Sequence, residues 1–498
     1  MIKTYATSGD KTWIDVTVTI DGVTYEHAGA RLKGNSSLFG LSLSYGGFEG
    51  RGGSFPDGEV PYEVKDQGFG EQESLPDGEV PDACFQALVN LGSQLPSFIS
   101  YGVIGPGLGY MPDALSKEKP EKLPWLIRLN RFVKGQKHQG YADIVIRSNF
   151  TETSLNEAVS LDLLERSGLA SQAAAHVRFR ANGGDPALRL MIEHPSDDAW
   201  QDRNFSAAGA LYKAESTGDW SYRGDAPAAY DEVFDQEGGK KVADLKPLIE
   251  FLKFINEADD TTFSAELPER LDVESFAIYL AMMELVQNWD DIDGPGNNAY
   301  LWWDAESARF TVVPWDMNLT FDDFVADFYG DLPDGYEPPD GGESSDITDP
   351  PDGYELPEGF EVPEECEPPE GVELPYGYEL PQYFEPPEGF EVPEECKLSD
   401  GYDLEGEPSK GSEVPEECNF FETSNPLVKQ FHANTEFESL YQKKLAELKA
   451  ELFDSQAADK VLAARVAVLV EQATDLVDAD TIRREADVIA QLMTSSDQ

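Results

Sequence analysis

Carboxylates and amides are concentrated between residues 288 and 318. The run NWDDIDGPGNN at 288–298 holds three aspartates and three asparagines, and Asp316 and Asn318 follow it. Carboxylate and amide oxygens are the ligands that Mg²⁺ takes in proteins, usually together with the phosphates of a substrate. A further aspartate could accept the proton of a hydroxyl that attacks phosphorus. The residue types therefore suit phosphoryl transfer, although an Asx-rich turn with solvated carboxylates has the same composition.

The order of these residues resembles that of protein kinases, and it leaves both interpretations open. A helix is expected at 273–288, the polar run follows it, and two short strands are expected at 299–303 and 309–313. The second strand leads into Pro-Trp-Asp, which ends at Asp316. In protein kinases a catalytic aspartate and a metal-binding asparagine likewise precede a hairpin and a second metal-binding aspartate.

The elements that must position these residues are strands first and helices later. Apolar residues alternate along 13–20, Asp21 and Gly22 form a type I′ turn signal, and a second strand is expected over 23–32. Ser154 and Glu157 have the spacing of a capping box ahead of a helix. No strand–helix–strand alternation runs through the chain, which predicts an α+β fold. Further strands are expected at 125–132, 141–147, 176–180, 188–193 and 210–214, and helices at 158–167, 242–257 and through most of 425–493.

The acidic charge of the chain is concentrated in two stretches. Its 498 residues carry a formal charge of −59, of which −27 lies in 331–419 and −8 in 54–84. Sequence repeats link the two parts of each stretch: PDGEVP occurs at 56–61 and 76–81, and PEGFEVPEEC at 357–366 and 387–396. Frequent proline blocks helices and sheet ladders, so we expect disordered insertions that are partly polyproline II. A low-affinity cation-binding tract is the alternative.

All four cysteines lie in these repeats or at their edges. They could form two disulfides in an oxidising compartment, whereas a metal site or a catalytic thiol is not expected there. The resulting division of the chain is 1–53, an insertion at 54–84, a core at 85–321, an insertion at 322–423 and a helical part at 424–498.

The overall charge also excludes classes of partner. Phosphates of nucleic acid or of an anionic membrane would be repelled over most of the surface. No apolar run approaches the ~18 residues that a membrane span requires, and the residues after Met1 lack the pattern of a signal peptide.

Several segments together resemble the CotH kinase family, atypical kinase-like proteins named after spore coat protein H. The segments are ARLKGNSS at 30–37, LPWLIR at 123–128, GALYK at 209–213 and the loop and hairpin at 288–316, with NPLV at 425–428 similar to the closing segment of the family. The resemblance implies a bilobal kinase-like fold with a strand-rich N-lobe and a helical C-lobe. It also implies binding of ATP with Mg²⁺ or Mn²⁺, and phosphorylation of Ser or Thr on a secreted, coat or envelope protein.

By the same resemblance, Asp316 is the metal-binding aspartate and Asn298, or its neighbour Asn297, is the second metal ligand. The catalytic aspartate is expected within 290–293, where Asp293 is favoured by its distance from Asn298 and Asp290 is close behind.

The resemblance also assigns residues to the nucleotide. Arg31 and Lys33 would line the phosphates, and Lys122 and Lys213 are both candidates for the lysine that contacts them. Glu157 would pair with such a lysine, as a helix glutamate does in kinases, unless it serves the capping box.

The acidic insertion that follows Phe321 suggests that a Lys- or Arg-rich protein is the partner, because opposite charges attract. Two other functions stay open: a catalytically silent surface adhesin or scaffold, and a nucleotidyl or amino-acid transferase on the same scaffold. The absence of a signal peptide pattern leaves a cytoplasmic location open too.

Overall fold

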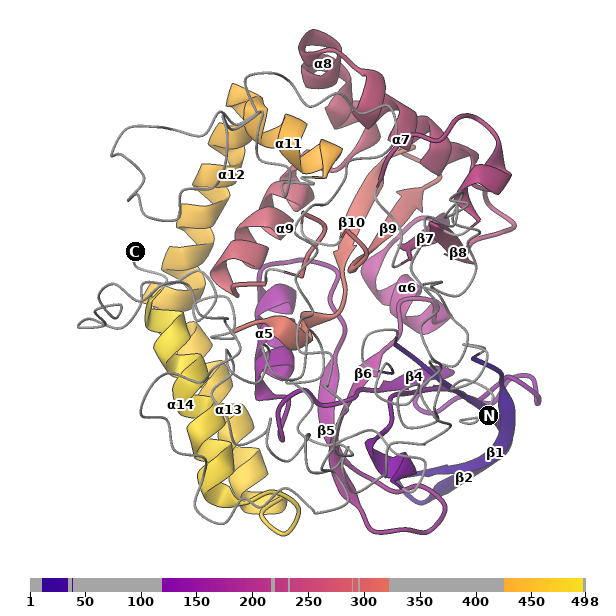
Figure 1. The fold of residues 1–498 in the computed structure, drawn as a ribbon, viewed down its shortest axis with the longest axis vertical. Helices are drawn as coiled ribbons and strands as arrows, with labels where there is room; N and C mark the ends of the chain where they lie inside the picture. Colours follow the sequence, from indigo (N-terminus) through magenta and orange to yellow (C-terminus); the bar gives the residue numbers. More distant parts are fainter. Residues whose placement is uncertain are drawn as a thin grey trace, which may run out of the picture.

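The computed structural model describes residues 11–34, 38, 119–215, 220–231, 233–288, 290–293, 296–321 and 425–495. Both predicted acidic insertions and all four cysteines lie outside these ranges. Strands and helices are combined as two separate antiparallel sheets with helices packed around them, which confirms the α+β prediction (Figure 1). Within these ranges no helix is both long enough and apolar enough to cross a membrane.

The first sheet has six strands in the order β1-β2-β3-β4-β6-β5, each antiparallel to its neighbours. Its first hairpin turns at Asp21 and Gly22, whose φ angles of 50° and 79° fit the predicted type I′ turn. Side chains on one face form a small core of their own, and those on the other face join the main core. The strands are β1 (Ile14–Ile20), β2 (Val23–Leu32), β3 (Trp125–Arg128), β4 (Asp143–Ile146), β5 (Ala174–Phe179) and β6 (Ala187–Glu193).

The second sheet has four strands in the order β10-β9-β7-β8. Lys213 of β7 lies directly opposite Tyr300 of β9. Gly209 allows this pairing, since a Cβ at that position would lie 2.3 Å from the Trp302 ring. The strands are β7 (Gly209–Ala214), β8 (Phe234–Gly238), β9 (Ala299–Asp304) and β10 (Phe310–Pro314).

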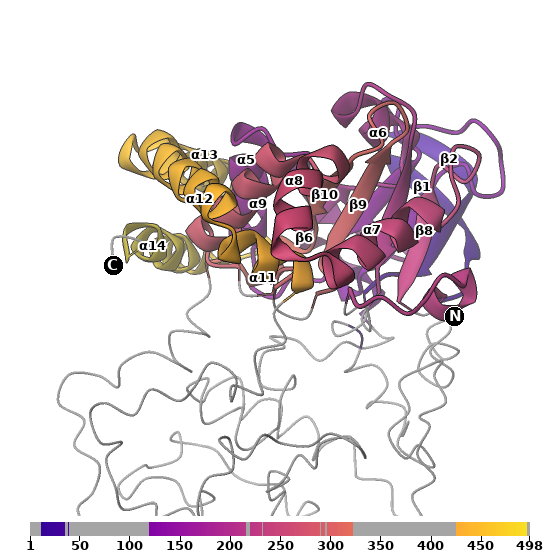
Figure 2. The ribbon, with the colours of Figure 1, turned by 90° about the horizontal axis from the view of Figure 1, so that it is seen from above.

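Nine α-helices occur in the described ranges, several of them with side-chain caps from Asp or Asn. Helix α5 lies between the sheets and a long C-terminal pair of helices, α13 and α14, and α12 packs against α9 (Figures 1 and 2). The helices are α5 (Leu155–Arg166), α6 (Asp198–Asn204), α7 (Lys246–Glu257), α8 (Asp260–Arg270), α9 (Val273–Leu285), α11 (Pro426–Ala433), α12 (Thr435–Leu448), α13 (Ala457–Gln472) and α14 (Ala479–Ser495).

The predicted capping box at the start of α5 is wrong. Ser154 has a left-handed backbone (φ 53°), and its side chain caps nothing. In the first turn the Thr153 hydroxyl accepts from Leu155 N–H at 3.1 Å. Just before the helix, Glu485 of α14 accepts from the N–H groups of Glu152 and Thr153 at 2.9 and 3.2 Å. The Glu157 side chain is therefore free to serve another purpose.

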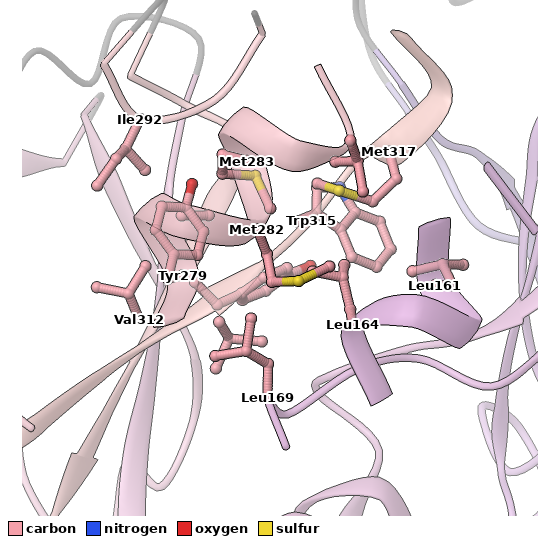
Figure 3. Close-up of a cluster of buried hydrophobic side chains, with 14 of the residues drawn as sticks. Leu161, Leu164, Leu169, Tyr279, Met282, Met283, Ile292, Val312, Trp315 and Met317 are labelled. Carbon is pink, nitrogen blue, oxygen red and sulfur yellow. The ribbon is translucent and has the colours of Figure 1, made fainter. Parts of the chain in front are cut away.

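Buried side chains of α5, α9 and β10 form one continuous core with the turn that follows β10. Figure 3 shows Leu164 of α5 beside Met282 of α9 and Trp315, with Met317 close to the tryptophan ring. Because Trp315 and Met317 are both buried here, the residue between them is held in a fixed position.

Candidate functional site

The turn after β10 carries Asp316 in a left-handed backbone conformation, with φ 68° and ψ 61°. Such a conformation is unfavourable for a non-glycine residue and persists only where its surroundings enforce it. Helix α5 enforces it: Asn156 Nδ2 donates to the carbonyls of Asn318 (2.8 Å) and Thr320 (3.1 Å). With the Asn318 amide turned so that its nitrogen faces Asp316, it donates to the Asp316 carboxylate at 2.8 Å.

Arg147 joins two carboxylates from different parts of the chain. It follows β4 directly, its Nε donates to Glu157 Oε2 at 3.0 Å, and its terminal nitrogen donates to Asp316. The Glu157 side chain is 1% exposed and that of Asp316 27%. Glu157 thus pairs with an arginine rather than with the lysine that the sequence suggested.

Burial shapes the titration of this cluster. Burial raises the pKa of Glu157, the charge of Asp316 raises it further, and the Arg147 guanidinium opposes both. Burial would lower the pKa of Arg147, but Asp316 and Glu157 outweigh it, so the net shift is upward. Arg147 therefore stays charged. It is the central cation of the site, and no sequence motif distinguishes it from the other residues at the ends of strands.

The two candidate catalytic aspartates have different surroundings. Burial and the charge of Asp316 raise the pKa of Asp290 to about 7, against the opposing effects of Asn298 and Lys213. Asn298 Nδ2 also donates to the Asp290 carbonyl at 2.8 Å. The Asp293 side chain is exposed, and its carboxylate accepts the backbone N–H of Asn425 at 2.9 Å, at the start of α11. The structure thus brings Asp290, rather than Asp293, electrostatically close to Asp316.

Lys213 reaches from β7 to the polar loop. Its ammonium donates to the carbonyls of Ala214 and Asn297 and lies 5.5 Å from the centre of the Tyr300 ring. Burial lowers its pKa, while nearby carboxylates, including Asp316 and Asp290, oppose the shift. Asn297 contributes its backbone carbonyl to this contact.

Further cations gather on the side of the six-stranded sheet. Lys33 Nζ lies 4.9 Å from the centre of the Trp315 ring. Burial, together with the charges of Lys213, Arg31 and Lys11, lowers its pKa to about 8, although Glu237 opposes the shift. Burial likewise lowers the pKa of Lys11 to about 8. Cations that depress one another's pKa form a site that an anion such as phosphate would stabilise.

Lys122 is placed differently from Lys213. It ends the short helix η2 (Pro120–Lys122), and its charged neighbours are Arg189 and Glu152. Arg189 in turn donates to the backbone carbonyl of Arg147. Of the two candidate lysines, Lys213 is thus the one in contact with the loop at 290–298.

His194 is a buried residue of the site that the sequence did not indicate. Its ring packs edge-on against Trp315 at 5.7 Å between centroids, and its Nε2 lies 3.5 Å from the Tyr300 hydroxyl and 3.9 Å from Glu237. Burial and the positive charges of Lys33, Arg128, Arg31 and Lys213 hold its pKa well below the usual value. It is therefore neutral at physiological pH and adds no charge to the cationic cluster.

A cavity of about 530 Å³ borders this cluster at Glu237. Its apolar wall is the Phe205 and Trp302 pair, whose rings stack at 4.4 Å. Backbone of Gly209, Gly238 and Gly239 forms another part of the lining. A volume of this size is in the range of small-molecule sites.

The donor set suits a cation that is shared with phosphates. Among the described residues, no group of three or more His, Cys, Asp or Glu side chains converges well enough to hold a metal. Asp316 and Asp290 supply two carboxylates, and the amide nitrogens of Asn318 and Asn298 face these aspartates. Mg²⁺ is commonly bound by one or two carboxylates together with substrate phosphates, so this set fits Mg²⁺ when a nucleotide completes the coordination.

Comparison with known proteins finds similarity to one family. The family model described as "CotH kinase protein" matches residues 114–354, which include Arg147, Glu157, Lys213, Asp290 and Asp316. The chain is 22% identical over 195 residues to "Inner spore coat protein H" of Bacillus subtilis (strain 168). That alignment covers 38% of this chain and 53% of the relative, so the chain spans about half the length of the curated protein it matches. Residues 114–354 of this chain are thus similar to the CotH family.

Proposed function

We propose that this protein is a phosphoryl transferase that uses ATP with Mg²⁺, or Mn²⁺, and phosphorylates Ser or Thr of a protein substrate. The observation that carries the proposal is the cluster of Arg147, Glu157 and Asp316. Protein kinases need a strand lysine paired with a helix glutamate, together with a metal-binding aspartate. Arg147 follows a strand, Glu157 lies on a helix and Asp316 follows a strand hairpin, so this chain has the same three roles with arginine in place of lysine.

In this proposal the two sheets belong to the two lobes of a kinase-like fold. The six-stranded sheet supplies Arg31, Lys33 and Arg147, and the four-stranded sheet with its loops supplies Lys213 and Asp316. Charges from both sides then meet where the triphosphate would lie. The cavity beside Trp302 adjoins this point and is large enough for the nucleoside.

We assign the role of general base to Asp290. A base works best when its pKa lies near the operating pH, and burial with the charge of Asp316 raises that of Asp290 to about 7. Asp293 instead holds the start of α11. Asp316 and Asn298 would hold Mg²⁺, whose charge would offset that of the phosphates, while Arg31, Lys33 and Lys213 would bind phosphate oxygens.

The proposed location rests on the name of the matched relative, and the proposed class of substrate rests on the net charge of this chain. The matched relative is named an inner spore coat protein, so we propose that this chain also acts at a coat or envelope. Its net charge of −59 favours a Lys- or Arg-rich protein as substrate.

The test is transfer of label by the full chain from ATP labelled at the γ phosphate, with Mg²⁺ or Mn²⁺ and a Lys/Ser-rich acceptor protein. Asp316→Asn should abolish transfer, and Asp480→Asn, a change at an exposed aspartate of α14, should leave it unchanged. Transfer of α label instead would indicate a nucleotidyl transferase. Absence of both nucleotide binding and label transfer would leave the scaffold or adhesin interpretation.

A further inference from the structure

Helix α5 carries Glu157 toward the site and Asp162 toward the C-terminal helices. Five residues correspond to a rotation of about 140° on a helix, so the two carboxylates point to different sides. Arg465 of α13 binds Asp162 through two nitrogens, at 2.8 and 2.7 Å, and donates to the Ala174 carbonyl at 3.0 Å. Two parallel hydrogen bonds between a guanidinium and a carboxylate fix orientation as well as distance.

Helix α14 holds the beginning of α5. The Glu485 carboxylate accepts the N–H groups of Glu152 and Thr153 and the Thr153 hydroxyl. Ser154 supplies no cap, and the Thr153 hydroxyl that accepts from Leu155 N–H is itself held, with the N–H groups of Glu152 and Thr153, by a side chain more than 300 residues away. Figures 1 and 2 both show α13 alongside α5, on the side of α5 that faces away from the sheets.

We propose that α13 and α14 form a positioning element of the site, in which Arg465 and Glu485 hold α5 so that Glu157 stays against Arg147. The effect on turnover rests on the proposed function, whereas the effect on α5 does not. Arg465 and Glu485 touch none of the residues assigned to substrate or metal, and they act through α5.

The charges of the cluster explain why this placement matters. Arg147 divides its hydrogen bonds between Glu157 and Asp316. If α5 moves away, Arg147 is left with Asp316 as its carboxylate partner in this cluster. A tighter pair between Arg147 and Asp316 would compete with metal binding by Asp316, so loss of Arg465 should weaken binding of the Mg²⁺ nucleotide.

The first test is Arg465→Met in the full chain, measured as kcat/KM for label transfer. We expect kcat/KM to fall about tenfold, which corresponds to the free energy that one hydrogen bond to a charged group commonly contributes. Arg465→Lys should recover part of it. In the double variant with Glu157→Gln, the change at Arg465 should add little, because residues that act through one group are not additive. Strictly additive losses would overturn the proposal.

Arg178→Met is the matched control. Arg178 of β5 binds Asp475 with two nitrogens, in an exposed pair that joins the same helical region to the sheet and leaves α5 untouched. The Arg178→Met variant should leave kcat/KM unchanged. A loss equal to that of Arg465→Met would instead show that kcat/KM depends on docking of the C-terminal helices in general, which would contradict the proposal.

Hydrogen exchange separates this inference from the proposed function. In Arg465→Met and Glu485→Gln, amides of residues 155–160 should exchange at least tenfold faster than in the wild type, whereas Arg178→Met should leave them unchanged. This result is expected even if the wild type transfers no phosphate, in which case only the proposed function fails. Unchanged exchange in both variants would refute the positioning role whatever the activity.

Discussion

The Nε of Arg147 lies 3.0 Å from Glu157 Oε2, and the Glu157 side chain is 1% exposed. This ion pair is buried on both sides, between β4 and α5. Buried pairs contribute little net stability when intact, but removal of one partner leaves an uncompensated charge that is costly. The geometry of the site and the stability of the fold therefore both depend on this ion pair.

Arg147→Met should lower the free energy of unfolding by about 3 kcal/mol or more, because Glu157 and Asp316 lose their cation. The measurement is chemical denaturation of the full chain. Arg147→Met combined with Glu157→Leu should recover part of the loss, since no buried carboxylate then remains on α5. If Arg147→Met unfolds with wild-type stability, the pair is not buried as described.

Asp290→Asn should affect turnover, whereas Asp293→Asn should affect stability. The first should lower kcat by about 10²- to 10⁴-fold with little change in stability, as expected for loss of a general base. The second should leave kcat nearly unchanged and lower stability by about 1 kcal/mol, because Asp293 satisfies a backbone N–H at the start of α11. Steady-state kinetics with a parallel thermal melt checks both, and the reverse pattern would return the role to Asp293.

His176 should make the fold less stable in acid. Its Nε2 lies 2.8 Å from the Thr153 carbonyl, and burial lowers its pKa from 6.5 to about 4, with Arg465 adding to the shift and Asp162 opposing it. The unfolded chain therefore takes up this proton first as the pH falls. Between pH 6.5 and 4, stability should decline by up to about 3 kcal/mol from this residue.

The check is the slope of unfolding free energy against pH in wild type and His176→Gln. The variant should lack this part of the decline, while other groups contribute equally to both proteins. Parallel curves for the two proteins over this range would contradict the assignment.

Binding of a polyanion should weaken above pH 8. Lys33 and Lys11 have pKa values lowered to about 8, so both lose charge as the pH rises through that value in the free protein. Titration calorimetry with inorganic tripolyphosphate should show proton uptake on binding near pH 8, and lower affinity at pH 9 than at pH 7. Lys33→Met should bind more weakly and show less uptake, whereas equal affinity at both pH values would exclude these lysines from the anion site.

Local patterns predicted much of the fold. Alternation along β1 and the turn at Asp21 and Gly22 placed the first hairpin, and the expected strands from 125 to 214 and from 299 to 313 all appear within a few residues. The sequence missed α6, β8 and α8. The start of α7 was expected at residue 242 but lies at Lys246, just before Pro247, whose ring suits a first helical turn.

The site was less predictable because its pairings cross the chain. Glu157 was identified, but its partner Arg147 was not, since a strand-end arginine has no distinguishing pattern. The preference for Asp293 used distance along the sequence, whereas the surroundings of Asp290 depend on how the loop folds back on Asp316. Lys33 and Lys213 both lie at the cationic cluster, while Lys122 is adjacent to Arg189.

The contact between Glu485 and the start of α5 has a consequence for synthesis of the chain. Glu485 follows Thr153 by 332 residues in the sequence. A ribosome adds about 5–20 residues per second. The start of helix α5 is therefore synthesised about 15 to 65 seconds before Glu485, which holds the residues leading into it. Asp316, the last of the assigned site residues, is made about halfway through that interval, so the site residues are complete before the contact from Glu485 can form, and competence is acquired late in translation.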